Sequence, residues 1–294
     1  MNLKKLVRAG LVTVTSLWSL TGSGVADIVA PSDPVPGHIG LTYFDLMKKV
    51  VTDLDPASPH GEAHQVVPYR HIEGKRAKTV PENAVAIKYL APLTVRADGM
   101  ARLALLADLG PSAADVAEFV LLALFDLTGE PKLLDVVEVG RDRLTGFADK
   151  PLVSLGHGSD LIRIDSDHFN SNEDFVDTEL ILVRNDHFQL VETIFTFDVK
   201  ACAFKVTELV NVTTLPDPGN AYERIVLAVT EKVELQDDAE GCGEAKVPRP
   251  SVRTFRATYR WHPRRRAFVA TSSNLHRLDE ENKRLIDPEA PAHR

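Results

Sequence analysis

Short runs in which apolar and polar residues alternate fill much of the chain after residue 84. The alternation is most regular from Thr178 to Leu235, where four consecutive segments place apolar side chains at every second position. Asn185-Asp186 separates the first two segments and tolerates the positive φ angles of a two-residue hairpin turn. Such alternation is typical of antiparallel strands with one buried and one solvated face. This stretch is therefore predicted to form two hairpins.

The same criterion predicts further strands on both sides of this stretch. They cover residues 85–90, 93–96, 101–106, 133–139, 152–155, 161–164, 252–261 and 267–271. Val116–Leu127 is almost wholly apolar, so periodicity alone does not separate a buried strand from a buried helix. We favour a hairpin that pairs this run with 133–139. Helices are expected at His38–Leu54 and from Ser273 or Asn274 to about Ile286.

These elements predict a mainly β protein with peripheral N- and C-terminal helices. The preferred fold is an antiparallel β-sandwich, and the alternative is an irregular propeller-like meander. Many short hairpins suit the propeller, but the absence of a fixed repeat counts against it. The expected division is a signal peptide at 1–26, a linker with a helix and loops at 27–83, the β domain at 84–272, and a C-terminal helix with a disordered tail at 273–294.

The N-terminus has the three parts of a secretory signal peptide. Lys4, Lys5 and Arg8 form a positive start, an apolar run follows to Leu20, and small residues occupy Gly24–Ala26. The apolar run is shorter than the roughly 20 residues of a membrane-spanning helix, and we expect no transmembrane segment after cleavage. These features predict a periplasmic or secreted protein.

Charge argues against one class of function, and the cysteine content predicts a disulfide. Loss of the leader and its three basic residues takes the formal net charge from −8 to −11. An acidic chain of this kind is not a general nucleic-acid binder. Cys202 and Cys242 flank the second hairpin of the alternating stretch, at its open end. In an exported protein two cysteines favour one disulfide, and this loop closure contributes roughly 3–4 kcal/mol.

Polar residues are densest between Asp165 and Asp174, where we expect a loop between two strands. Clustered carboxylates and amides are ligands that calcium prefers. The candidate ligands are Asp165, Asp167, Asn170, Asn172, Glu173 and Asp174. The stretch starts like an EF-hand loop but has Phe169 at the third ligand position. The competing interpretation is a polar turn whose side chains cap its own backbone. No other cofactor is expected.

His168 lies in the same stretch and suggests a different chemistry. Its ordinary pKa is close to neutrality, so it could act as a general base together with Asp165 or Asp167. A secreted hydrolase with or without a metal is therefore the alternative function. The sequence has no recognisable nucleophile or metalloprotease motif, so whether the protein is an enzyme stays open, with a non-enzymatic protein favoured.

Basic residues gather between Lys246 and Arg266, where eight occur without an acidic one. Alternation puts Arg256 and Arg260 on the face opposite the aromatic side chains, which are expected in the core. The two arginines form a candidate docking face for an envelope protein or an anionic envelope surface. The competing interpretation is a solvated basic face. The function predicted is a non-enzymatic exported protein that binds a partner or ligand in the cell envelope.

Overall fold

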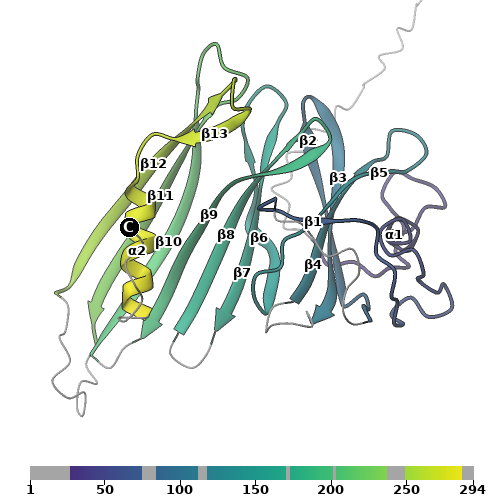
Figure 1. The fold of residues 1–294 in the computed structure, drawn as a ribbon, viewed down its shortest axis with the longest axis horizontal. Coiled ribbons are helices and arrows are strands. Elements are labelled where there is room, and N and C mark those ends of the chain that lie inside the picture. The colour runs from purple at the N-terminus through teal and green to yellow at the C-terminus, as the bar shows by residue number, and fades with distance from the viewer. Residues whose placement is uncertain are drawn as a thin grey trace, which may run out of the picture.

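The computed structural model describes residues 27–74, 84–111, 118–169, 173–200, 203–236 and 249–286. These residues form two β-sheets and two short helices (Figure 1). The prediction of a mainly antiparallel β protein with a sandwich-like arrangement is confirmed. Within the described ranges there is no helix long and apolar enough to cross a membrane.

The first sheet has five strands in the order β1-β5-β4-β3-β2. Their bounds are β1 (Arg70–His71), β2 (Tyr89–Ala97), β3 (Met100–Pro111), β4 (Glu118–Asp126) and β5 (Lys132–Glu138). The turn between β2 and β3 uses Asp98 and Gly99 with φ angles of 51° and 82°. The apolar run that could have been a helix is strand β4, paired antiparallel with β5 as predicted.

The second sheet has eight strands in the order β13-β12-β11-β10-β9-β8-β7-β6. Their bounds are β6 (Leu144–Ser154), β7 (Asp160–Phe169), β8 (Glu173–Arg184), β9 (His187–Lys200), β10 (Phe204–Leu215), β11 (Arg224–Leu235), β12 (Ser251–His262) and β13 (Ala267–Ala270). Asn185 and Asp186 have φ angles of 50° and 60°, which confirms the predicted hairpin turn.

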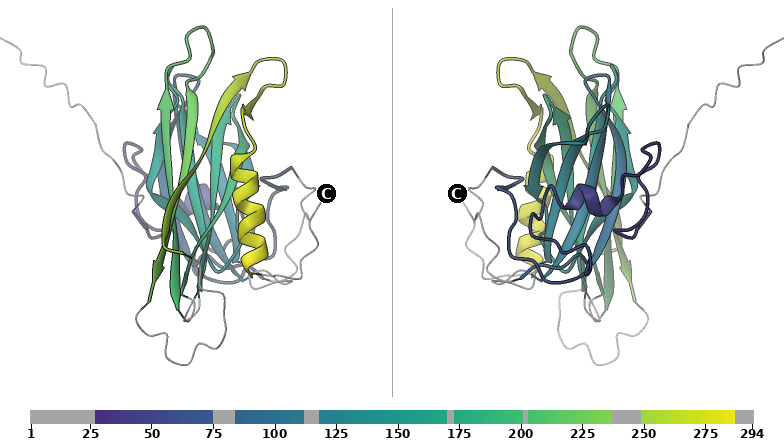
Figure 2. Two further views of the ribbon diagram at one scale, coloured as in Figure 1. Left: turned by 90° about the vertical axis from the view of Figure 1, so that its left-hand side faces the viewer. Right: turned by 90° about the vertical axis from the view of Figure 1, so that its right-hand side faces the viewer.

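The core lies on both faces of the five-stranded sheet because its strands are apolar at successive positions. Leu122 and Leu124 of β4 pack with Ile162 and Ile181 of the eight-stranded sheet. Phe125 and its neighbours of the same parity point the other way, toward the N-terminal segment. Figure 2 shows that segment, with helix α1 (Tyr43–Met47), lying over the outer side of the five-stranded sheet.

Helix α2 (Asn274–Ile286) confirms the predicted C-terminal helix and packs against β12 and β9. It runs across the eight-stranded sheet in front of the strands between them (Figure 1). Leu278 is buried in a third apolar cluster with Leu227 and Val229 of β11, and Leu275 packs against this cluster.

The helix predicted for residues 38–54 is wrong in extent. Helix α1 begins after Thr42, whose hydroxyl accepts from the backbone N–H of Asp45, and ends at Met47. Beyond it Val51 forms an isolated antiparallel bridge with Val66. β-Branched residues lose side-chain freedom in a helix, so pairing with a distant segment replaces the helix there.

Candidate functional site

The stretch predicted as a polar loop is mostly strand, which corrects the expectation. Asp165, Asp167 and His168 belong to β7, and β8 begins at Glu173. The backbone groups of β7 pair with β8, with Asp165 opposite Thr178, so they need no capping from the side chains. Asn170, Asn172 and the side chain of Glu173 lie outside the described residues.

The strand geometry separates His168 from the two aspartates proposed to act with it. Neighbouring residues of a strand point to opposite faces, so His168 faces away from Asp167 and Asp165. The His168 Nδ1 atom lies 2.8 Å from Oδ1 of Asp142 instead. Asp165 accepts a 2.6 Å hydrogen bond from the Thr178 hydroxyl. His168 is therefore paired with a carboxylate that the sequence did not indicate, because Asp142 lies outside the polar stretch.

The candidate calcium ligands do not converge within the described part of the chain. Among those residues, no three or more His, Cys, Asp or Glu side chains are arranged to hold a metal ion. Burial raises the pKa of Asp167 to about 6, and the nearby Asp165 and Asp174 add to the shift.

A buried carboxylate in the eight-stranded sheet forms ionic contacts that the sequence did not reveal. Glu179 in the middle of β8 is fully buried and accepts a 2.6 Å hydrogen bond from Nε of Arg141. The Arg141 guanidinium also donates to Glu73 over 2.8 Å and to the Thr193 hydroxyl over 3.2 Å. Burial raises the pKa of Glu179 to about 7, and Arg141 offsets only part of this effect.

Two further buried glutamates, Glu208 of β10 and Glu231 of β11, lie directly opposite each other. Arg253 of β12 holds Glu231 through two hydrogen bonds of 2.8 Å each. Glu208 instead accepts from Asn282 of α2 over 2.8 Å. Alternation marked these glutamates only as interruptions of an apolar face, and pairing between strands is needed to see their partners.

The two arginines of the predicted docking face lie on one face of strand β12. Both side chains are exposed, on the face opposite Tyr259 and Trp261. Arg260 binds Asp217 through Nε at 3.1 Å and Nη2 at 2.9 Å. Its guanidinium group is therefore engaged within the chain, whereas the docking role of the face stays a prediction.

The predicted disulfide falls on Cys202 and Cys242, which both lie outside the described residues. The nearest described contact joins the ends of the same hairpin: the Gln236 N–H donates to the Ala203 carbonyl over 2.9 Å. The disulfide stays a prediction.

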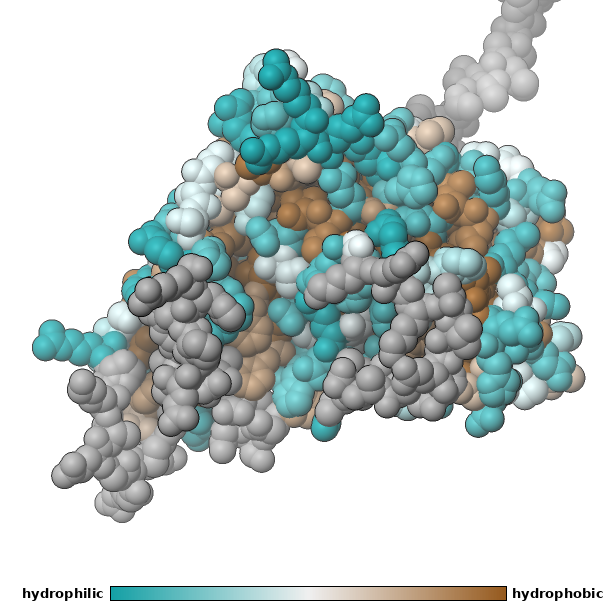
Figure 3. Space-filling model, viewed as in Figure 1, coloured by the Kyte–Doolittle hydropathy of each residue, from teal (hydrophilic) through white to brown (hydrophobic). Residues whose placement is uncertain are grey.

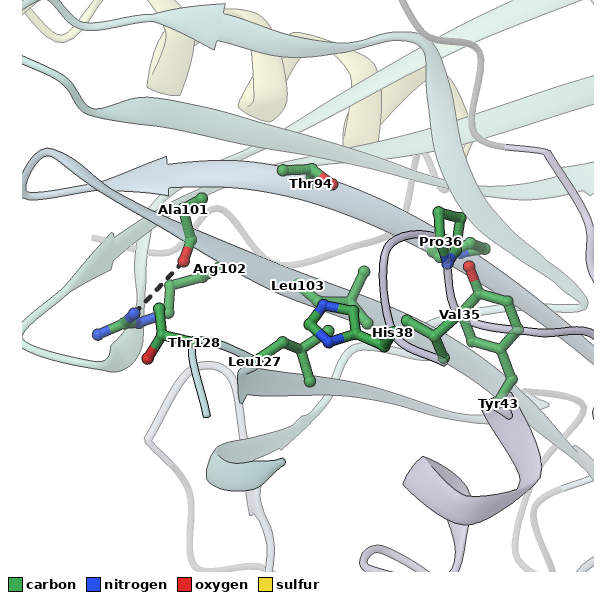
Figure 4. A pocket seen from close by; sticks show the side chains of 11 residues that line it. Val35, Pro36, His38, Tyr43, Thr94, Ala101, Arg102, Leu103, Leu127 and Thr128 are labelled. Atoms are coloured by element: carbon green, nitrogen blue, oxygen red, sulfur yellow. Dashed lines mark hydrogen bonds between the residues drawn. The ribbon is translucent and has the colours of Figure 1, made fainter. Parts of the chain in front are cut away.

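A pocket of about 410 Å³ lies between the N-terminal segment and one end of the five-stranded sheet. Its volume is within the range of small-molecule sites. Figure 4 shows the His38 ring between Val35 and Leu127, with Arg102 at the opposite end from Tyr43. The lining consists of Val35, Pro36, His38, Tyr43, Pro92, Thr94, Ala101, Arg102, Leu103, Leu127 and Thr128.

The N-terminal segment that forms one wall is folded back on itself. The Val35 N–H donates to the Leu41 carbonyl over 2.9 Å, and the Tyr43 N–H donates to the Asp33 carbonyl over 3.1 Å. These contacts place His38 and Tyr43 over the sheet. Burial and the nearby Asp33 raise the pKa of Tyr43, so its hydroxyl stays a hydrogen-bond donor at neutral pH. Residues 27–83 had been expected to form a linker, a helix and loops, and nothing in their sequence indicated which surface they cover.

Arg102, the charged group of the lining, is balanced by two carboxylates. Its side chain is 4 % exposed, its Nε lies 2.9 Å from Asp186, and its Nη1 lies 3.4 Å from Asp126. The positive charge is therefore neutralised within the chain, and the rest of the lining is mainly apolar or uncharged.

Comparisons with protein-family models, with curated proteins and with solved structures find no match for this chain. The function has to be argued from its own residues.

Proposed function

We propose that this is an exported, non-catalytic binding protein that holds a small, largely apolar molecule in the pocket beside His38. The pocket itself carries the proposal: a half-open cavity of about 410 Å³ lined in part by Val35, Leu103 and Leu127, with a few polar groups at its edges. Pockets of this kind bury the apolar part of a ligand and orient it through a small number of hydrogen bonds.

The charges around the pocket favour an uncharged ligand. An anion would have to compete with Asp126 and Asp186 for the Arg102 guanidinium and would lie near both carboxylates. A hydroxyl, ether or carbonyl group can use His38 and the Tyr43 hydroxyl without this competition.

The proposal is tested with the uncharged fluorescent probe N-phenyl-1-naphthylamine. Thr94 is exposed at the pocket, so Thr94→Trp fills the space without replacing a core residue. We expect the affinity for the probe to fall at least about tenfold, the equivalent of roughly 1.4 kcal/mol. Thr213→Trp, at an exposed position of β10, is the matched control and should bind as the wild type does. Equal binding by both variants would exclude the pocket as the binding site.

Export is the second part of the proposal and depends on residues 1–26 alone. Lys4, Lys5 and Arg8 before the apolar run support it. N-terminal sequencing of protein recovered outside the cytoplasm should begin at Asp27. A chain that keeps Met1 and its leader in the cytoplasm would contradict export and leave the binding proposal intact.

One contact favours the alternative function, a hydrolase that uses His168. Its Nδ1 lies 2.8 Å from the Asp142 carboxylate, the arrangement that orients a general base. Ester and phosphoester substrates can be screened against the wild type and His168→Ala. Turnover that disappears in the variant would support this alternative, and turnover that is absent or unchanged would exclude it.

A further inference from the structure

Helix α2 directs one buried amide group at the eight-stranded sheet. Asn282 is fully buried, and its Nδ2 donates to Oε2 of Glu208 over 2.8 Å. The backbone N–H of Phe197 in β9 donates to the same oxygen over 3.3 Å. One oxygen of the Glu208 carboxyl group therefore accepts both hydrogen bonds.

The remaining two polar atoms of this pair have no donor. Oε1 of Glu208 and Oδ1 of Asn282 are buried, and neither has a hydrogen-bond partner among the described residues. An ionised carboxyl group accepts only, so it would leave both atoms unsatisfied. A protonated carboxyl group has one O–H to donate, and the Asn282 amide oxygen is the buried acceptor left without a partner among the described residues.

We infer that Glu208 is protonated in the folded protein and forms a cyclic acid–amide pair with Asn282, which fastens α2 to the sheet. The amide Nδ2–H donates to Oε2, and the carboxyl Oε1–H donates to Oδ1. With this assignment, both carboxyl oxygens of Glu208 and both amide heavy atoms of Asn282 take part in a hydrogen bond. It makes the attachment of α2 dependent on one proton.

The charges around Glu208 agree with a neutral carboxyl group. Glu231 on β11 lies directly opposite, and it occupies Arg253 of β12 through two hydrogen bonds. Arg253 also contacts Glu281 of α2 at 3.1 Å. Arg253 is thus shared by two other carboxylates. Burial is the main cause that raises the pKa of Glu208 to about 7, with Glu231 adding to it.

Ionisation of Glu208 would loosen the helix. The charged group loses its donated hydrogen bond and directs a negative oxygen at the amide oxygen of Asn282. Leu278 of α2 is buried in the apolar cluster that includes Leu227 and Val229. A loosened helix therefore uncovers an apolar area of the sheet, and this happens as the pH rises through neutrality.

Carbon-13 NMR of the Glu208 carboxyl group in the full chain tests the protonation directly. We expect this carbon to titrate near pH 7, as burial beside Glu231 requires. Titration near the ordinary glutamate value of 4.5 would overturn the inference.

Amide hydrogen exchange of α2 tests the attachment. Glu208→Gln keeps both hydrogen bonds without a titrating proton. In the wild type, exchange of α2 corrected for the intrinsic rate should speed up at least about tenfold between roughly pH 5.5 and pH 8. In Glu208→Gln it should change little. Glu234→Gln, at an exposed position of β11, is the charge-matched control and should behave as the wild type. The same acceleration in Glu208→Gln and the wild type would refute the proposed role of the Glu208–Asn282 pair.

Discussion

Strands β4 and β8 are both buried in their middle, but they bury different kinds of residue. In β4 every residue from Phe119 to Phe125 is apolar and buried, and alternate side chains serve the two faces of the five-stranded sheet. In β8 one buried face carries both ionisable and apolar residues. Glu179 is fully buried, and the apolar Ile181 and Val183 follow it on the same face.

The difference separates an apolar stretch, Phe119–Phe125 of β4, whose packing does not depend on pH from strands that bury glutamates in their middle. Burial of apolar area stabilises β4 at any pH. At Glu179 and Glu208 the contribution depends on protonation, because burial raises the pKa of each to about 7. We therefore expect acid and base to act mainly on the eight-stranded sheet and on α2.

The largest expected effect is a truncation in the apolar sheet. Phe125 is fully buried on the face toward α1, so Phe125→Ala should lower the free energy of unfolding by about 3–5 kcal/mol. The loss should be the same at pH 5.5 and pH 8 within about 0.5 kcal/mol. Urea denaturation at both values measures it. Leu209→Ala is the control, because the Leu209 side chain is 65 % exposed.

Removal of the cation beside Glu179 should have a somewhat smaller effect that depends on pH. Arg141→Met leaves Glu179 buried without its partner, and we expect a loss of roughly 3 kcal/mol at pH 8. At pH 5.5 the carboxyl group can take up a proton, so the loss should be smaller. Arg143→Met is the control at an exposed neighbouring position. An equal loss at both pH values would contradict the role given to Glu179.

The pH dependence of stability provides a third test, in which Glu208→Gln is compared with the wild type. The folded-state pKa of Glu208, about 7, lies above its ordinary value of 4.5. The folded state therefore binds more protons between these values, and stability falls as the pH rises from 4.5 to 7. Over this range the wild type should lose on the order of 2–3 kcal/mol more than Glu208→Gln. Parallel curves for the two proteins would contradict the prediction.

The smallest effect is expected at the start of α1. The Thr42 hydroxyl and the Asp45 carboxylate cap each other's backbone, so Thr42→Ala should cost about 1 kcal/mol. Thr254→Ala, at an exposed position of β12, should cost less. Because α1 covers the apolar sheet, the loss should not vary with pH between 5.5 and 8, and thermal denaturation at both values measures this.

Local patterns predicted the hairpins well because alternation and turn residues act within a few positions. The Asn185-Asp186 turn and the alternating faces of β10 and β11 needed no distant partner to be recognised. The polar stretch failed as a loop prediction because its residues are satisfied by the neighbouring strand, as Asp165 is by Thr178. That pairing is a tertiary contact that composition does not reveal.

The candidate sites could not be predicted from the sequence because they too depend on tertiary contacts. His38 and Tyr43 belong to the N-terminal segment, whereas Leu103 and Leu127 come from the ends of β-hairpins far along the chain. The Glu208–Asn282 contact joins residues 74 positions apart. Each site exists only once the segments have packed, and a single sequence does not show which segments meet.

Residue-resolved amide exchange on the whole protein at about pH 5.5 and about pH 8 tests the contrast between the two sheets most directly. After correction for intrinsic rates, α2 and the parts of β8 and β10 around Glu179 and Glu208 should lose protection at the higher pH. Protection of the apolar stretch Phe119–Phe125 in β4 should stay unchanged. A uniform loss in both sheets, or no loss around the two glutamates, would contradict the account.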